Sequence, residues 1–370
     1  MVTALRAARA ADSFDYKFAA YTEENDRMRV ITQSARGETE LGAAHLTVQG
    51  TIDTITGATP TGEPAPTGSA QVPLALFPRE IRRAAIFELG RSFGRNELSG
   101  SFTFSKEPDY VSRAFSLTDL VDLNRKNTVL QFGYAHDNDT VQPFFFAQPL
   151  KKRSDDFIAG VTQILDPVTT LTFDLTHGNV RGYLADPYKA IVKTVVVDPA
   201  HPELTLTLPF PENRPAAREH WIALLSATRF ITPLHGSLEA SYRYFRDNWG
   251  IDSHTAELAW FQQLGRYVVL RPGFRFYRQS AADFYRLTLN GTPIDPTAHV
   301  NGAAPFYSAD YRLARLETTT VGLKLVVRLG AHFSADLTGE HYVMRGRDGV
   351  TPQSAFPSAR IVTAGITCRF

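Results

Sequence analysis

The final stretch, "RIVTAGITCRF" (residues 360–370), alternates apolar residues with polar or small ones. Val362, Ala364, Ile366, Cys368 and Phe370 fall on one side of an extended strand, because successive side chains of a strand point to opposite faces. The pattern therefore predicts a strand with one apolar face. A soluble antiparallel sheet shows the same alternation, so the rest of the chain has to decide the fold.

The same two-residue alternation recurs along the chain, for example in "TVGLKLVVRL" (320–329) and "AHFSADLTGEHYV" (331–343). No run of about 18 apolar residues occurs, which excludes a helical membrane span. A transmembrane barrel passes this test, because only every second residue of its strands meets lipid. Pro272 predicts a bulge or local distortion in its strand. The alternation predicts about sixteen strands, which start near residues 14, 27, 39, 81, 95, 112, 127, 154, 168, 217, 234, 252, 266, 311, 331 and 358.

The connections between these strands alternate between long and short. Tight turns are predicted at Arg36-Gly37-Glu38, Asn124–Asn127, Asp166-Pro167, Leu264-Gly265-Arg266 and Gly330. Outer-membrane barrels place short turns on the periplasmic side and long loops outside. The fold class predicted is all-β, a closed antiparallel transmembrane β-barrel over 13–370, with both termini periplasmic. The long outer loops are expected at 56–80, 138–153, 181–216 and 279–310.

Composition excludes several other classes. Lysine and arginine (39) nearly balance aspartate and glutamate (38), giving a formal charge of +1, so no nucleic-acid partner is expected. Cys368 is the single cysteine, and no His-Glu-x-x-His motif occurs, so no disulfide, metal site or cofactor is predicted. Residues 1–12 contain two arginines but no apolar core, and are interpreted as a leader remnant or a flexible tail.

The second face of the strands carries charge of both signs, which suits a polar lumen. Two arrangements of these charges remain open: a basic wall facing an acidic one across the pore, or a lattice of ion pairs that fills the interior. The choice depends on strand stagger. The residues assigned to the lumen are Asp174, Glu239, Arg243, Glu257, Arg271, Arg275, Lys324, Arg328, Asp336 and Glu340.

Two segments resemble known outer-membrane proteins. The C-terminal pattern formed by Thr363, Gly365, Cys368 and Phe370 resembles the insertion signal of Gram-negative outer-membrane barrels. The segment 160–191 resembles a family of proteobacterial outer-membrane barrels of unknown function, and the resemblance extends over about 14–370. It implies the outer membrane of a Gram-negative bacterium, contact with its lipid, and recognition of the last strand by the barrel-assembly machinery.

The family's loop motif runs here from Arg181 to Tyr188 through Gly182, Tyr183, Asp186 and Pro187. A loop folded over the mouth, with Asp186 bonding backbone amides, is favoured over a substrate- or partner-contacting surface. Tyr183 and Tyr188 are expected in an interfacial aromatic girdle.

The leading functional hypothesis is a porin-like channel for small hydrophilic or ionic solutes. The alternative is a non-conducting scaffold that docks a partner of the cell envelope. A barrel enzyme using His177 or His341 is a distant third. No Gly-x-Ser-x-Gly motif accompanies these histidines, so the protein is not expected to be an enzyme.

Overall fold

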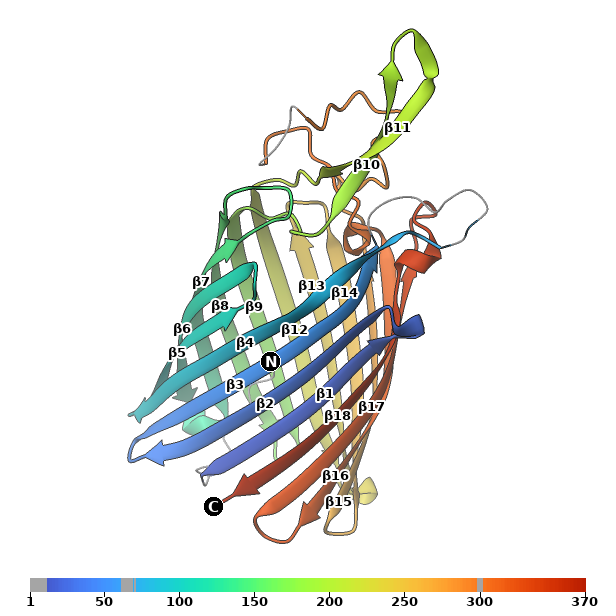
Figure 1. Ribbon diagram of the computed structural model, residues 1–370. Helices are drawn as coiled ribbons and strands as arrows, with labels where there is room; N and C mark the ends of the chain where they lie inside the picture. The colour runs from blue at the N-terminus through green and yellow to red at the C-terminus, as the bar shows by residue number, and fades with distance from the viewer. Residues whose placement is uncertain (1–11, 61–68, 70, 298–301) are drawn as a thin grey trace.

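The protein forms a closed barrel of sixteen antiparallel strands, seen in a computed structural model that describes residues 12–60, 69, 71–297 and 302–370 (Figure 1). The barrel strands pair with their neighbours in sequence order, and the first closes against the last. The predicted fold class is confirmed. Within the described ranges, no helix is long and apolar enough to cross a membrane. Residues 1–11 of the predicted leader or tail lie outside these ranges.

The barrel strands are β1 (Ser13–Glu23), β2 (Met28–Leu41), β3 (Ala44–Pro60), β4 (Leu74–Phe93), β5 (Asn96–Lys106), β6 (Tyr110–Leu123), β7 (Thr128–Val141), β8 (Leu150–Asp166), β9 (Thr169–Gly182), β12 (Ala217–Ile231), β13 (Gly236–Asp247), β14 (Asp252–Leu264), β15 (Val268–Gln279), β16 (Leu316–Leu329), β17 (Phe333–Gly346) and β18 (Ser358–Arg369). A separate hairpin consists of β10 (Ala190–Asp198) and β11 (His201–Pro211). Single 3₁₀ turns are η1 (Glu24–Asp26), η2 (Asn124–Lys126), η3 (Thr232–Leu234), η4 (Tyr311–Leu313) and η5 (Gln353–Ala355).

The outer face of the ring is apolar. On β16, for example, Val321 (56% exposed) and Leu323 (49%) are exposed on the outer face. Lys324, which follows Leu323, lies on the opposite, inner face. Large aromatic and aliphatic side chains are similarly exposed around the whole circumference. Contiguous apolar surface of this extent marks a face that meets lipid or another protein.

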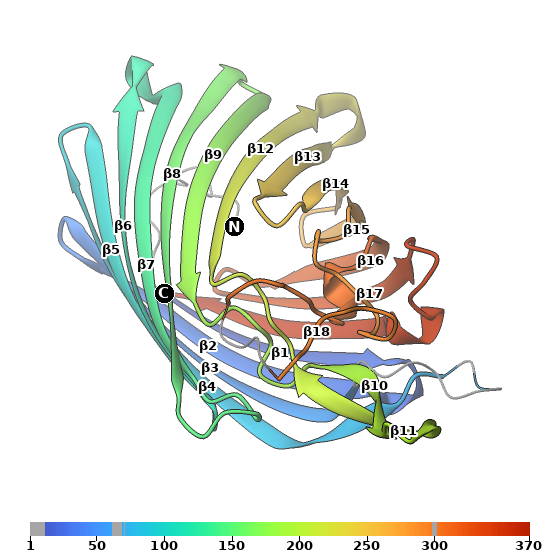
Figure 2. The ribbon, with the colours of Figure 1, turned by 90° about the horizontal axis from the view of Figure 1, so that it is seen from above.

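Loop length is sorted between the two ends of the ring (Figure 1). One end carries only short turns, together with the start of β1 and the end of β18, where Ser13 pairs with Arg369. All long connections lie at the other end, the mouth, which also carries the short connections 24–27, 107–109 and 248–251. Figure 2 shows parts of segments 183–216, 280–297 and 302–315, drawn in lime and orange, passing over the interior of the ring.

Several predicted boundaries are wrong. The turn placed at Gly37 occurs instead at Gly42, and Gly37 pairs with Val48 inside the β2–β3 ladder. The loop predicted at 56–80 is shorter, because β3 extends to Pro60 and β4 begins at Leu74; most of its remainder lies outside the described residues. The loop predicted at 138–153 shrinks to 142–149, and the one predicted at 279–310 is longer, because β16 begins only at Leu316.

The hairpin β10–β11 was not predicted and occupies most of the loop expected at 181–216. It projects above the barrel in Figure 1. Its base is anchored, since Ile191 and Val192 are fully buried and pack near Leu289 and Tyr307 of the 280–315 loop. The buried apolar clusters of the described residues thus lie mainly at the mouth.

The last strand has the predicted alternation. Val362 (47% exposed), Ile366 (57%) and Phe370 (72%) belong to the outer face. Pro272 causes no bulge, because the β14–β15 register is the same on both sides of it, but the ladder is interrupted there between Gly273 and Leu270.

Candidate functional site

Charged side chains line a cavity inside the ring. The cavity has a volume of about 620 Å³ and is walled by β12 to β18, and Arg312 of the 280–315 loop reaches it from above. We call it the lower cavity. Of the ten charged residues assigned to the lumen from the sequence, five line it: Glu239, Glu257, Arg271, Arg275 and Glu340.

A second cavity of about 470 Å³ lies at the mouth, and Arg243 lines it. We call it the mouth cavity. It shares Tyr277, Gln279 and Arg312 with the lower cavity, so the two meet at these residues. Four of the assigned residues line neither cavity: Asp174, Lys324, Arg328 and Asp336.

Most of the assigned cations are paired on their own wall. Arg271 lies 3.5 Å from Glu239, and Arg275 lies 3.2 Å from Glu257. Lys324 on β16 lies 3.3 Å from Asp336 on β17. The arrangement with a basic wall facing an acidic one across the pore is therefore wrong for these residues. The pairs leave the lower cavity empty of protein, so they do not fill the interior either.

The loop motif begins where the chain leaves β9. Gly182 has φ +112°, and a Cβ there would lie 2.2 Å from the carbonyl oxygen of Lys151, so only glycine fits without strain. The next amide, of Tyr183, donates to that same carbonyl (2.9 Å), and the Tyr183 ring packs edge-on against Phe146 with centroids 5.8 Å apart. Arg181, just before, donates to Asn179 (3.2 Å).

The remainder of the motif ties the loop to the mouth. Asp186 accepts a hydrogen bond from the amide of Tyr188 (2.9 Å), and the Pro187 carbonyl accepts from the amide of Phe144 (3.2 Å). The Tyr188 hydroxyl contacts Asp109 and donates to Glu80 (2.9 Å). The expected girdle position of both tyrosines is wrong, because carboxylate contacts hold Tyr188 at the mouth and Tyr183 packs there against Phe146. Burial and these two carboxylates raise the pKa of Tyr188, which keeps the phenol a donor.

Carboxylates gather around Tyr188. Oxygen atoms of Glu80, Glu107 and Asp109 lie within 4.8 Å of one another. Burial, with the nearby charge of Asp109, raises the pKa of Glu107. Arg82 offsets part of the negative charge from 3.9 Å. This cluster joins the β4 wall and the β5–β6 connection to the motif loop.

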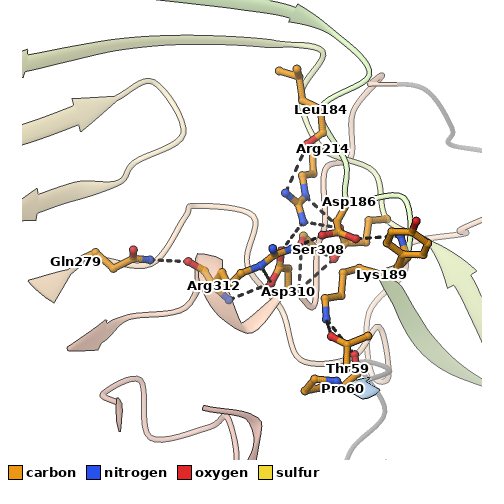
Figure 3. Close-up of polar contacts among 12 residues, drawn as sticks. Thr59, Pro60, Leu184, Asp186, Lys189, Arg214, Gln279, Ser308, Asp310 and Arg312 are labelled. Atoms are coloured by element: carbon orange, nitrogen blue, oxygen red, sulfur yellow. Dashed lines mark hydrogen bonds and ion pairs between the residues drawn. The ribbon is translucent and has the colours of Figure 1, made fainter. Parts of the chain in front are cut away.

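A network of ion pairs joins the two loops that cross the mouth (Figure 3). Arg312 donates to Asp310 through Nε (2.8 Å) and Nη2 (2.6 Å), and also contacts Asp186. Arg214, from the other loop, lies 2.9 Å from Asp310 and 2.7 Å from Glu212. Glu212 also accepts from the hydroxyl of Ser308 (2.6 Å) and the amide of Asp310 (3.1 Å). The network therefore fixes the position of segment 280–315 against segment 183–216.

Position in this network decides how its carboxylates ionise. Burial disfavours the charge on Asp310, but Arg312 and Arg214 outweigh it and lower its pKa. Glu212 contacts one cation of the described residues, Arg214, and burial together with the charge of Asp310 outweighs it and raises the pKa of Glu212. Burial likewise lowers the pKa of Lys189, whose ammonium contacts Thr59 and donates to the carbonyl of Pro60 (3.2 Å).

The histidines considered for catalysis face outward. Strand alternation places Asp174 and His177 on opposite faces of β9, and Glu340 and His341 on opposite faces of β17. The His177 ring instead packs against Trp221, with centroids 4.3 Å apart. Neither histidine can share a proton with the carboxylate that precedes it.

The network residues Lys189, Glu212, Arg214, Asp310 and Arg312 were not predicted. A weak signal exists, because "ENR" (212–214) and "DYR" (310–312) place opposite charges two residues apart inside long loops. The sequence gives no indication that the two segments meet.

Three solved structures illustrate the likeness of this fold to known barrels. A bacterial polysaccharide outer membrane secretin is 8% identical with a TM-score of 0.51, over 98% of this chain and 100% of that one. CdiB from Acinetobacter baumannii is 8% identical with a TM-score of 0.55, over 97% of this chain and 60% of that one. The siderophore receptor PirA from Pseudomonas aeruginosa is 10% identical with a TM-score of 0.44, over 92% of this chain and 57% of that one.

At these identities the likeness concerns the fold alone, and the chain spans well under two thirds of the length of CdiB and PirA. No curated protein matches the chain. A family model described as "Protein of unknown function (DUF3570)" matches residues 1–154 and 145–354. These two matches cover nearly the whole barrel, so the chain belongs to this family of unknown function.

Proposed function

We propose that the protein is an integral outer-membrane channel of a Gram-negative bacterium, which conducts small hydrophilic or ionic solutes. The observation that carries the proposal is the solvent-accessible lower cavity with its charged lining. Glu257 (side chain 51% exposed) and Arg275 (50%) are as accessible as surface residues, although they lie inside the ring. Such exposure requires water in the lumen, and a wet lumen with charged walls is the environment of a porin-type pathway.

The mouth network acts in this proposal as the constriction. Arg312 belongs to the network and lines both cavities, so a solute that moves between them passes its guanidinium. Selection by charge and by loop contacts is how aqueous pores discriminate among solutes. The orientation proposed puts the mouth outside the cell and both chain ends in the periplasm, with the apolar outer face in lipid. The assembly machinery would engage β18.

Conductance in planar bilayers tests the proposal. Purified, folded protein is expected to produce discrete ohmic current steps in KCl. Folding is verified independently by circular dichroism, so that silence from folded protein would refute conduction. Substitution of Arg312 by alanine is expected to enlarge the steps, because it removes a side chain that lines both cavities.

A non-conducting scaffold is the second candidate, and the β10–β11 hairpin favours it. Val197 (63% exposed), Leu204 (52%) and Leu206 (51%) are apolar side chains on an element that projects beyond the barrel. Deletion of the hairpin tests this candidate: a protein that is silent in bilayers when intact and that loses a co-purifying envelope protein on deletion would favour the scaffold over the channel. We propose no catalytic role, in line with the outward position of His177 and His341.

A further inference from the structure

The mouth cavity has a strongly basic wall. Four arginines line it: Arg214, Arg218, Arg243 and Arg312. The only carboxylates of the described residues that reach its lining are Asp186 and Asp310. Both are engaged by Arg312, at the side where the two loops cross. The opposite side, formed by the ends of β12 and β13, presents arginine without an acid in the lining.

Arg243 has no counter-ion among the residues that the structure describes. It projects from β13 into the cavity, and no described carboxylate lies within ion-pair distance of it. Arg243 shares the lining of the cavity with Arg218 and Tyr277, so two positive groups from β12 and β13 face the same space. A guanidinium that faces water beside other cations is a ready partner for an anion.

Arg218 is already oriented. Its Nε (2.7 Å) and Nη2 (2.6 Å) both bind Asp247, which is buried behind it. Its guanidinium lies over the rings of Trp249 (4.6 Å) and Phe245 (5.4 Å). Among the residues that the structure describes, none accepts a hydrogen bond from Nη1 of Arg218, which leaves that nitrogen for a ligand. Held in this way, the side chain loses little entropy when it binds.

The remaining wall combines apolar side chains with the polar groups of Ser253, Tyr277 and Gln279. Leu184, Phe245, Ile251 and Leu313 line the cavity next to the arginines, and all four belong to one hydrophobic cluster around Trp249. A volume of about 470 Å³ is within the range of small-molecule sites, roughly 300–1,000 Å³. The combination of basic and apolar walls favours an anion that carries an apolar part, because such a ligand uses both surfaces.

We propose that the mouth cavity binds small organic carboxylates, with the carboxylate on Arg243 and Arg218 and the apolar part against Phe245 and Leu313. This inference rests on the proposed function, since it names the class of solute that the channel admits.

Calorimetric titration of the full chain in detergent micelles tests the inference with three probes. Benzoate is expected to bind, its neutral isostere benzamide to bind at least about tenfold more weakly, and acetate, which lacks the apolar part, also more weakly. Arg243→Gln is expected to reduce benzoate affinity about tenfold or more, and Arg243→Lys to give an intermediate affinity. Arg328→Gln is the matched control, because it removes one lumen-side arginine outside both cavities.

Each result decides the inference. Equal affinity for benzoate and benzamide, absence of benzoate binding, or equal losses in Arg243→Gln and Arg328→Gln would overturn it. The probe comparison uses the unsubstituted protein, so it holds even if a variant does not fold. Bilayer conductance reports on the proposed function separately. If the protein conducts but does not bind benzoate, the channel proposal stands and the proposed ligand class is wrong. If the protein binds benzoate but does not conduct, the ligand class stands and the channel proposal is wrong.

Discussion

Replacement of Arg312 by alanine is expected to loosen the 280–315 loop without unfolding the barrel. The substitution removes the bidentate contact with Asp310 and the contact with Asp186. Charged hydrogen bonds are worth roughly 1.5–3 kcal/mol each, but two features reduce the loss. Arg312 is half exposed (50%), and Asp310 keeps Arg214 at 2.9 Å. A net cost of about 1–3 kcal/mol follows, which is about 5- to 150-fold in the opening equilibrium of the loop.

Hydrogen exchange measures this change directly. The amides of Leu313 and Ala314 donate to the carbonyls of Asp310 (2.8 Å) and Tyr311 (3.1 Å), so they exchange only when the loop opens. Their protection is expected to fall by the factor given above in Arg312→Ala, and barrel-strand amides should be unaffected. Arg286→Ala is the control, because Arg286 is exposed in the same loop and forms no ion pair with the described residues.

Protection at Leu313 that changes less than twofold in Arg312→Ala would refute the reasoning, as would an equal loss in Arg286→Ala. The first result would mean that apolar packing, not the ion pairs, holds the loop. The second would mean that any truncation in the loop destabilises it.

Three further outcomes are expected. The guanidinium groups of Arg312 and Arg214 lower the pKa of Asp310, so the contribution of Asp310 to loop protection should be complete above about pH 5 and decline below about pH 4, toward the folded-state pKa. Hydrogen exchange corrected for intrinsic rates measures this contribution. A decline that begins near pH 6 would contradict the assignment to Asp310. Gly182→Ala should lower the free energy of unfolding by about 1–3 kcal/mol, because Gly182 has φ +112° and the Lys151 carbonyl blocks a Cβ there. Gly37→Ala is the control and should be neutral in thermal unfolding, because a Cβ at Gly37 meets nothing within 4 Å. Equal effects of the two substitutions would count against the register. Arg275→Gln should change the unfolding free energy by less than about 1 kcal/mol, since Arg275 and Glu257 are both half exposed. The same substitution should shift ion selectivity toward cations. Unchanged reversal potentials would place the pair outside the conduction path.

Alternation was sufficient to predict the ring, because one lipid face and one lumen face impose a period of two on every spanning strand. It failed at Gly37, where a glycine that looked like a turn pairs with Val48 within a strand. It also misplaced the start of β16, because Tyr311–Leu313 form a 3₁₀ turn in which the Asp310 side chain accepts from the amide of Arg312. The alternation did not predict where strands end, because strands such as β3 and β4 continue into the segments predicted as loops.

The mouth could not be predicted in the same way. Its contacts join Arg214 to Asp310 and Tyr188 to Asp109, and these partners are far apart in sequence. A periodic pattern reports which face a residue occupies, but not which loop it meets. The protruding hairpin was masked by the prolines around it, although "KTVVV" (193–197) and "LTLTL" (204–208) carry strand-forming residues.

The pairing of β1 with β18 has a consequence for biogenesis. Ser13 finds its partner in Arg369, almost the entire polypeptide away. Contacts of such high sequence separation form slowly, because the loop entropy is lost before the contact is gained. Until β18 has been synthesised, β1 has an unsatisfied edge that is open to pairing with another chain. The polypeptide must therefore be kept apart from its copies until its two ends meet.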